Sequence, residues 1–186
     1  MWFIAGMTDI TDYWNLRRNA GNPEQKEKKG MMKDIADALR LNADILTEAC
    51  DRIRSEGTSC VVIRDDEIIH SADGRGVAPL LALYNQHRDK LKGSCVVDRI
   101  VGKAAAMILV LGEVKAVYGD VMSEAAREYL TARGMPFRCG SYVDVISAQT
   151  GTGICPIESS VLAIDDPVAG LAAVIQRVAE LQQAAG

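Results

Sequence analysis

Hydrophobic and polar positions follow two different periods along the chain. Over residues 33–56, apolar residues recur three, four or seven positions apart, a spacing that predicts one amphipathic helix. Two short apolar runs, 59–63 and 67–70, then flank Asp65-Asp66 and predict an antiparallel hairpin with a tight turn.

The second half of the chain alternates strand-like and helix-like segments. Predicted strands cover 94–97, 114–118 and 142–146, and predicted helices cover 77–91, 98–111 and 123–133, followed by a helical turn after Pro156 and a last helix from Asp166-Pro167. The helix over 98–111 is apolar nearly all round, which indicates a central position. The last helix is expected to bury one apolar stripe, formed by Val168, Leu171, Ala172, Ile175 and Val178.

Strands that alternate with helices of 10–15 residues predict an α/β fold, here a mixed central sheet of about five strands with helices on both faces. The pattern places this domain at 33–186. Residues 1–32 read as an N-terminal extension, partly disordered or weakly packed, because they hold both tryptophans and a mixed charge run at 24–29.

Composition narrows the class of protein. The net charge of −4 argues against a nucleic-acid partner. No apolar run is long enough for a membrane span, and the opening residues lack the features of a signal peptide. The five cysteines form no C-x-x-C pair, so free thiols in a reducing, cytoplasmic setting are expected, with no metal and no cofactor.

Two predicted helix starts carry candidate site residues. Gly74, Arg75 and Gly76 precede one helix, and their backbone donors and guanidinium suit a phosphate or carboxylate; the alternative is a plain turn that needs glycine. Asp98 starts the next helix, as a catalytic group or simply as its cap. Lys103 lies in that apolar helix, either paired with Asp98 or Glu158 in a site, or reaching the surface.

A third candidate region follows the loop at 149–153. Thr152 and Gly153 are expected to form a backbone nest for an anion, or an ordinary loop. Cys155 precedes Pro156 at a predicted helix start, where free N–H groups favour a thiolate nucleophile. Glu158 falls at the capping-box position of the same turn. The alternative is that this motif is a structural cap.

Three ordered motifs resemble the bacterial family termed domain of unknown function 1893. They are Gly74-Arg75-Gly76-Val77-Ala78-Pro79-Leu80-Leu81, Asp98-Arg99-Ile100-Val101-Gly102-Lys103-Ala104-Ala105-Ala106 and Cys155-Pro156-Ile157-Glu158. The resemblance covers about residues 33–165. It implies a three-layer fold of the cytidine-deaminase-like superfamily, whose order of helices and strands matches the predicted one.

Zinc deaminases carry H-x-E at one helix start and P-C-x-x-C at the next. Here those starts hold Gly74-Arg75-Gly76 and Asp98-Arg99, so no zinc site is expected there. A scattered site from His70, Cys95 and Cys155 is the remaining metal alternative.

The leading hypothesis is therefore a domain that binds a small anionic or nucleotide-like ligand in the superfamily's usual cleft. One alternative is an enzyme that uses Cys155 as nucleophile. Another is a non-enzymatic module that binds a partner or forms a homo-oligomer, as deaminase-like folds often do.

Overall fold

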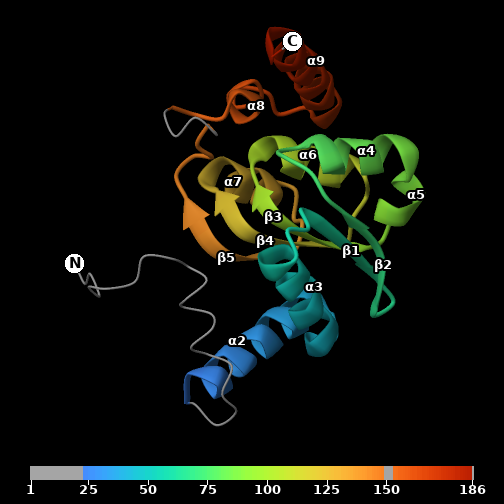
Figure 1. The fold of residues 1–186 in the computed structure, drawn as a ribbon, viewed down its shortest axis with the longest axis vertical. Coiled ribbons are helices and arrows are strands. Elements are labelled where there is room, and N and C mark those ends of the chain that lie inside the picture. The colour runs from blue at the N-terminus through green and yellow to red at the C-terminus, as the bar shows by residue number, and fades with distance from the viewer. Residues whose placement is uncertain (1–22, 149–152, 186) are drawn as a thin grey trace, which may run out of the picture.

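The computed structural model describes residues 23–148 and 153–185. A five-stranded sheet lies at its centre, with helices on both faces (Figure 1). The predicted α/β class with a mixed sheet of about five strands is confirmed.

The strands follow the spatial order β2-β1-β3-β4-β5. They are β1 (Cys60–Arg64), β2 (Glu67–Ala72), β3 (Cys95–Val101), β4 (Ala116–Ser123) and β5 (Phe137–Val143). β1 runs antiparallel to β2 and β3, whereas β3, β4 and β5 are mutually parallel. The carboxyl ends of three strands therefore meet at one edge of the sheet.

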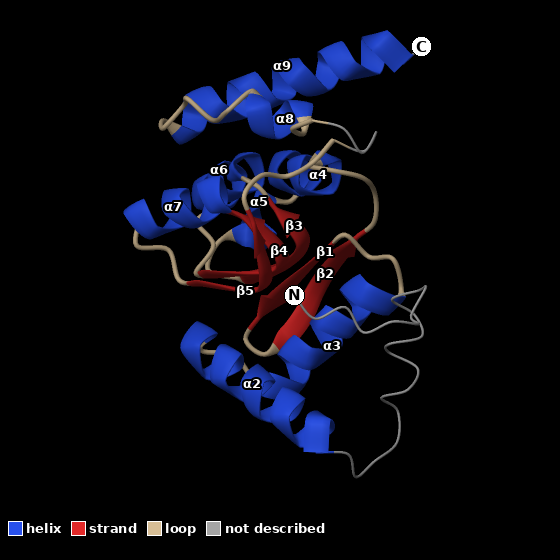
Figure 2. Cartoon of the chain, turned by 90° about the vertical axis from the view of Figure 1, so that its left-hand side faces the viewer, coloured by secondary structure: helices blue, strands red, loops and turns tan. Residues whose placement is uncertain are grey.

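The helices form layers around this sheet. They are α2 (Pro23–Leu39), α3 (Ala43–Ser55), α4 (Ala78–Gln86), α5 (Arg88–Leu91), α6 (Lys103–Leu111), α7 (Glu124–Ala132), α8 (Pro156–Ser159) and α9 (Pro167–Ala185). The helices α2 and α3 cover one face, and α4 to α7 cover the other. α9 lies outside α6 as a further layer (Figure 2).

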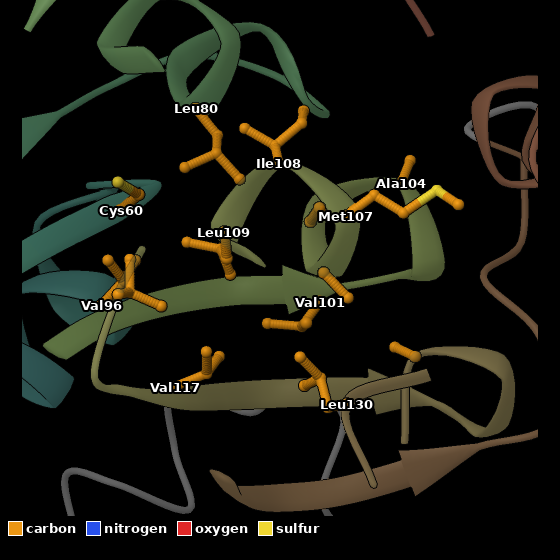
Figure 3. Packing of buried hydrophobic residues seen from close by; sticks show 14 of the residues in the cluster. Cys60, Leu80, Val96, Val101, Ala104, Met107, Ile108, Leu109, Val117 and Leu130 are labelled. Atoms are coloured by element: carbon orange, nitrogen blue, oxygen red, sulfur yellow. The ribbon is translucent and has the colours of Figure 1, made fainter. Parts of the chain in front are cut away.

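Two apolar clusters hold the layers together. In the larger one, Val96 and Val117 from the sheet pack with Leu80 of α4 and with Met107 and Leu109 of α6 (Figure 3). The smaller one joins α2 and α3 to the other face through residues that include Met32, Leu46, Ile53, Val61 and Tyr118. The buried apolar area is the main source of stability in such a fold.

Two predicted helices in the N-terminal half are each divided in two. The helix expected over 77–91 is α4 and α5, because His87 leaves the helical conformation with a φ of −142° and a ψ of 42°. The single helix expected over 33–56 is two helices, because Arg40 adopts a left-handed φ of 55° and Asn42 caps α3 by accepting from the N–H of Asp44 at 2.8 Å. α2 also crosses position 32, where the N-terminal extension was expected to end, and Met32 is buried. Residues 1–22 lie outside the described part of the chain.

The hairpin over β1 and β2 is confirmed. Asp65 and Asp66 both have positive φ, 54° and 59°, the conformation of a two-residue type I′ turn. Aspartate tolerates this region better than most residues, so the turn follows from local sequence.

The central helix begins later than predicted. Asp98 to Val101 continue β3, since Asp98 pairs with Gly119 and Val101 with Met122 across the parallel ladder, and α6 begins at Lys103. β5 likewise lies at Phe137–Val143, before the segment 142–146 expected to be the strand. In both cases pairing with β4 decides the boundary, and the sequence of a single segment does not contain that information.

The predicted stripe of the last helix is right in part: Leu171 and Val178 pack against the larger core, but Val168, Ala172 and Ile175 do not. Val168 is 63% exposed and Ile175 is 47% exposed, whereas Gly170 and Val174 face the core. A Cβ at position 170 would overlap the side chain of Met107, so the glycine allows α9 to approach α6 closely. Within the described ranges, none of the helices combines the length and the apolarity needed to cross a bilayer.

Candidate functional site

The candidate site lies where the loop after β2 meets the ends of β3 and β4. α4, α6 and α7 all begin at this edge. In open α/β sheets, ligands bind outside the carboxyl ends of parallel strands, so this edge is the first place to look for a site.

The turn before α4 depends on its glycines. Gly74 has a φ of 145° and Gly76 a φ of 57°, and a Cβ on Gly74 would lie 2.8 Å from the ring of Pro79. The hydroxyl of Ser59 donates to the carbonyl of Gly74 at 2.6 Å and fixes the turn against the start of β1. Arg75 is exposed at its tip.

Asp98 lies on β3 beside this turn. It pairs across the antiparallel ladder with Cys60, the residue that follows Ser59. One Asp98 carboxylate oxygen accepts from the N–H of Ile100 at 3.1 Å. The residue is half-buried as a whole, but desolvation of its carboxyl group raises its pKa to about 7, against the opposing effects of backbone hydrogen bonds and of Arg99. Asp98 is therefore a carboxyl that changes charge near neutral pH.

Glu158 joins the starts of two helices. Its side chain is 2% exposed, and its Oε1 accepts from the hydroxyl of Ser123 at 2.6 Å. That hydroxyl in turn accepts from the N–H of Ala126 and caps α7. The carboxylate also packs against Gly102, where α6 begins, and a Cβ there would collide with it. A negative charge at two helix N-termini is favourable, so the position supports a role in holding α8 in place.

Lys103 is buried but does not pair with Asp98 or Glu158. Its ammonium donates to the carbonyl of Leu162 at 2.7 Å and lies 3.4 Å from the carboxylate of Asp165. It also lies 5.7 Å from the centre of the Tyr129 ring. These contacts connect α6 to α7 and to the segment before α9.

Cys155 is half-buried at the start of α8, and its side chain makes no capping hydrogen bond. α8 has four residues, too few for the extended helix dipole that the thiolate hypothesis requires. Gly153, which has a φ of 80°, accepts from the N–H of Ala148 in a short bridged turn. Thr152 lies outside the described residues.

The two histidines lie far from α8. The rings of His70 and His87 are 5.8 Å apart, on β2 and between α4 and α5, and α8 is separate from both of these elements (Figure 1). His70 pairs with Val62 and shares its face of the sheet, while Cys95 is buried on the other face. The scattered zinc site from His70, Cys95 and Cys155 is therefore wrong.

The residues at the helix starts do not fit the zinc of the deaminase-like superfamily. Gly74 to Val77 precede α4, and Gly102 precedes α6; neither place holds a histidine or cysteine. In the described part of the chain, no three His, Cys, Asp or Glu side chains are grouped so as to hold a metal ion. A ligand at this edge would therefore be bound by its backbone donors and side chains.

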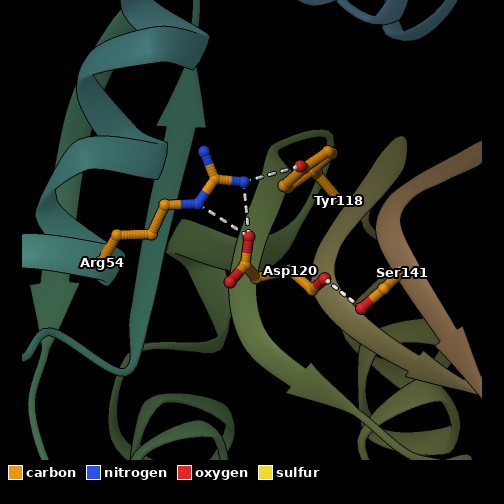
Figure 4. A network of polar contacts seen from close by, with 4 residues as sticks. All are labelled: Arg54, Tyr118, Asp120 and Ser141. Carbon is orange, nitrogen blue, oxygen red and sulfur yellow. Dashed lines mark hydrogen bonds and ion pairs between the residues drawn. The ribbon is translucent and has the colours of Figure 1, made fainter. Parts of the chain in front are cut away.

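A second polar network lies on the opposite face and was not predicted. Arg54 of α3 donates through Nη2 to Asp120 at 2.5 Å and to the hydroxyl of Tyr118 at 3.2 Å (Figure 4). Burial is the largest single effect and lowers the pKa of Arg54, but the bond to Asp120 together with the charges of Asp120, Tyr118 and Cys50 outweighs it, so the arginine pKa is raised. Ser141 donates to the Asp120 carbonyl at 3.4 Å. Nothing in the spacing of these residues along the chain signals their contact.

The structure thus brings together part of the predicted set. Gly74, Arg75 and Gly76 lie beside Asp98 through Ser59. A second group joins Glu158 to the starts of α6 and α7. Lys103 points to Leu162 and Asp165, and Cys155 makes no polar side-chain contact to either group.

Comparisons with known proteins identify a family for most of the chain. The family model for the domain of unknown function DUF1893 matches residues 48–177. The crystal structure of a DUF1893 family protein, TM1506 from Thermotoga maritima, is similar with a TM-score of 0.66 and 26% identity, over 73% of this chain and 91% of that one. No curated protein matches the sequence.

Two further similar structures are forms of RibD from Acinetobacter baumannii. Both are 16% identical, with TM-scores of 0.39 and 0.38, over 62% and 81% of this chain and 35% and 41% of theirs. The likeness is weak, and no site residue is transferred from it.

Proposed function

The chain belongs to the DUF1893 family, and from that premise we propose that it binds a small anionic or nucleotide-like ligand at the edge of the sheet where α4 begins. The observation that carries the proposal is Asp98. A carboxyl group with a pKa of about 7 lies directly beside a glycine turn at the end of a strand.

Asp98 suits the recognition of a polar ring. When protonated it donates one hydrogen bond and accepts another, and when ionised it accepts from an exocyclic amine or a hydroxyl. A structural cap gains little from a raised pKa, because a capping carboxylate is most useful when charged. Perturbed carboxyls of this kind are enriched at functional sites.

The turn before α4 supplies the complement for an anion. The backbone of Gly74, Arg75 and Gly76 approaches without side-chain bulk, and the start of α4 has no side-chain cap to occupy its N–H groups. The exposed guanidinium of Arg75 adds a bidentate donor for phosphate or carboxylate. A ligand with a phosphate and a polar ring matches this arrangement, with the phosphate at the turn before α4 and the ring beside Asp98.

A panel of nucleotides and phosphorylated metabolites in a thermal-shift assay tests this proposal. We expect at least one compound to raise the Tm, and Asp98→Asn and Arg75→Ala to reduce that shift. Arg138→Ala is the matched control, because Arg138 is an exposed arginine on β5. If no compound stabilises the wild-type protein, or if Arg138→Ala acts like Arg75→Ala, the proposal fails.

The catalytic cysteine is the weaker alternative. Cys155 has neither a long helix behind it nor a histidine beside it, since both histidines lie near α5. We therefore propose that the chain binds a ligand at this edge of the sheet, and we assign Cys155 no role as a nucleophile.

A second candidate function is self-association through α9. Val168 and Ile175, seven residues apart, lie on one helical face and are 63% and 47% exposed. Light scattering on the purified chain tests this candidate. A mass that stays at one chain over a hundredfold range of concentration would exclude it.

A further inference from the structure

A group of basic side chains lies at the other end of α4. We call the side chains of His70, His87 and Lys90 the basic cluster. His70 is on β2, His87 connects α4 to α5, and Lys90 is in α5. The Nζ of Lys90 lies 3.3 Å from Nδ1 of His70, and the two imidazole rings are 5.8 Å apart between centroids.

Among the effects of other side chains on the pKa of His70, repulsion by like charges is the main one. Desolvation lowers the pKa of His70, and the charges of Lys90 and His87 lower it further. The chain as a whole is acidic, with a net charge of −4, so a local group of three basic side chains differs from the rest of the protein. The Lys90 ammonium donates to Nδ1 of a neutral His70, and protonating that ring would place two positive charges together, which costs free energy unless an anion offsets them.

The other charged groups around the cluster have separate contacts. Arg64 of β1 donates to the backbone carbonyl of Asp89 at 3.0 Å, and Glu67 lies opposite Arg64 in the hairpin register. Arg88 bonds the carbonyl of Leu111 and lies over the ring of Tyr84. The carboxylate of Asp89 is exposed. None of these contacts places a carboxylate between the two histidines and the lysine.

We propose that the basic cluster binds a phosphate-type oxyanion. A tetrahedral anion offers several acceptor oxygens, and Lys90, His70 and His87 supply donors from three separate segments of the chain. Binding couples to proton uptake, because both imidazoles donate best when protonated. Affinity therefore falls as the pH rises and His70 loses its proton.

This location is separate from the ligand edge proposed above. α4 has nine residues, so Gly76 and His87 are separated by about 13 Å of helix. A negative result for ligand binding at the sheet edge would therefore leave the oxyanion proposal unchanged, and the reverse is also true.

The chain offers a specific probe, because His70 and His87 are its two histidines. Titration of the intact protein with inorganic phosphate, followed by proton NMR of the imidazole Cε1–H signals at constant ionic strength, observes this cluster alone. We expect both signals to shift saturably and the pKa of His70 to rise with phosphate. Sodium chloride at the same ionic strength should not reproduce the effect.

Two lysines of one segment give a matched pair of variants. Lys90→Gln should weaken phosphate binding about tenfold, the loss of one charge-assisted hydrogen bond. Lys92→Gln should leave it unchanged, because Lys92 is exposed and pairs with Glu113 at 2.9 Å. His87→Gln, at an exposed position, is a second variant that should weaken binding.

Three results would overturn the proposal. They are a wild-type protein whose histidine signals do not saturate with phosphate, an equal response to chloride, and equal weakening by Lys90→Gln and Lys92→Gln. The last of these would indicate diffuse surface charge. The wild-type titration decides the question even if a variant fails to fold.

Discussion

Two carboxyl groups at the edge of the sheet, those of Asp98 and Glu158, have different roles. Asp98 and Glu158 are both partly or wholly withdrawn from water, yet their surroundings differ. Asp98 accepts from one backbone N–H in a desolvated position, whereas Glu158 accepts from Ser123 beside two helix starts. The first arrangement leaves a carboxyl that titrates near neutrality, and the second fixes the position of α8.

Asp98→Asn tests this assignment through pH. The folded pKa lies above the unfolded one, so the folded state binds more protons between about pH 4 and pH 7, and stability from this group is lost as pH rises through that window. The variant should equal the wild type near pH 4 and exceed it at pH 8 by about 1–2 kcal/mol, less than the full shift implies because the residue is half-buried. Urea unfolding at both pH values measures this. Equal stabilities at pH 8 would contradict the raised pKa.

Gly102→Ala tests the contact between Glu158 and the start of α6. The new Cβ would meet the Glu158 carboxylate and lie 3.2 Å from the side chain of Ile146, so we expect a loss of about 1–3 kcal/mol in the free energy of unfolding. Gly30→Ala is the matched control. Position 30 is helical with open space around it, so that change should stabilise by about 0.5–1 kcal/mol. Destabilisation by both would imply a general intolerance of alanine.

At the scale of elements, polar contacts fix how helices lie on the sheet. α3 is joined to β4 by Arg54 and Asp120, and α6 is joined to the segment before α9 by Lys103. Gly140 allows the first contact, because a Cβ there would lie 2.8 Å from the carbonyl of Asp120. Strand pairing, in contrast, decides where α6 begins and where β5 lies.

Arg54→Met tests the connection between α3 and β4. The change keeps the apolar stem but leaves Asp120 without its strongest partner in a half-buried position, so we expect a loss of about 1–3 kcal/mol. Adding Asp120→Asn should recover part of that loss. Glu48→Gln removes the exposed pair with Arg52 and should cost less than about 0.5 kcal/mol. Equal costs for the two pairs would mean that burial adds nothing here.

At the scale of the whole molecule, the two cores protect different thiols. Cys60 belongs to the larger core, and Cys50 and Cys95 belong to the smaller one. Burial raises the pKa of Cys60, and it raises that of Cys95 to about 12. Cys139 and Cys155 are half-buried.

Thiol labelling tests both cores at once. Without denaturant, a disulfide reagent should modify Cys155 and Cys139 well before the three buried cysteines, with Cys139 slowed because burial raises its pKa, and the buried cysteines should react only at the rate of global unfolding. Cys155→Ala should remove one fast equivalent and leave stability almost unchanged. Mass spectrometry of the labelled peptides identifies the sites. Rapid labelling of Cys60 or Cys95 in the native protein would contradict the sheet as described.

Local patterns were sufficient for features that depend on a few neighbouring residues. The hairpin at Asp65-Asp66, the cap at Ser123 and the cap at Asp166, which accepts from Ala169 at 2.7 Å, were all predictable because each is a short-range arrangement. The α/β class followed from the alternation of periods. The glycine turn at Gly74 could also be identified from the sequence as a candidate site.

The sequence by itself therefore determined the class, most elements and the ends that use local capping chemistry. Tertiary structure decided where β3 ends, which face α9 buries, which partner Lys103 finds and that Asp98 is desolvated. Each of these depends on residues distant in the chain: Gly119, Met107, Leu162 and Cys60. The physical reason is that hydrogen-bond ladders, close packing and desolvation are properties of the assembled neighbourhood, while periodicity and capping are properties of a segment.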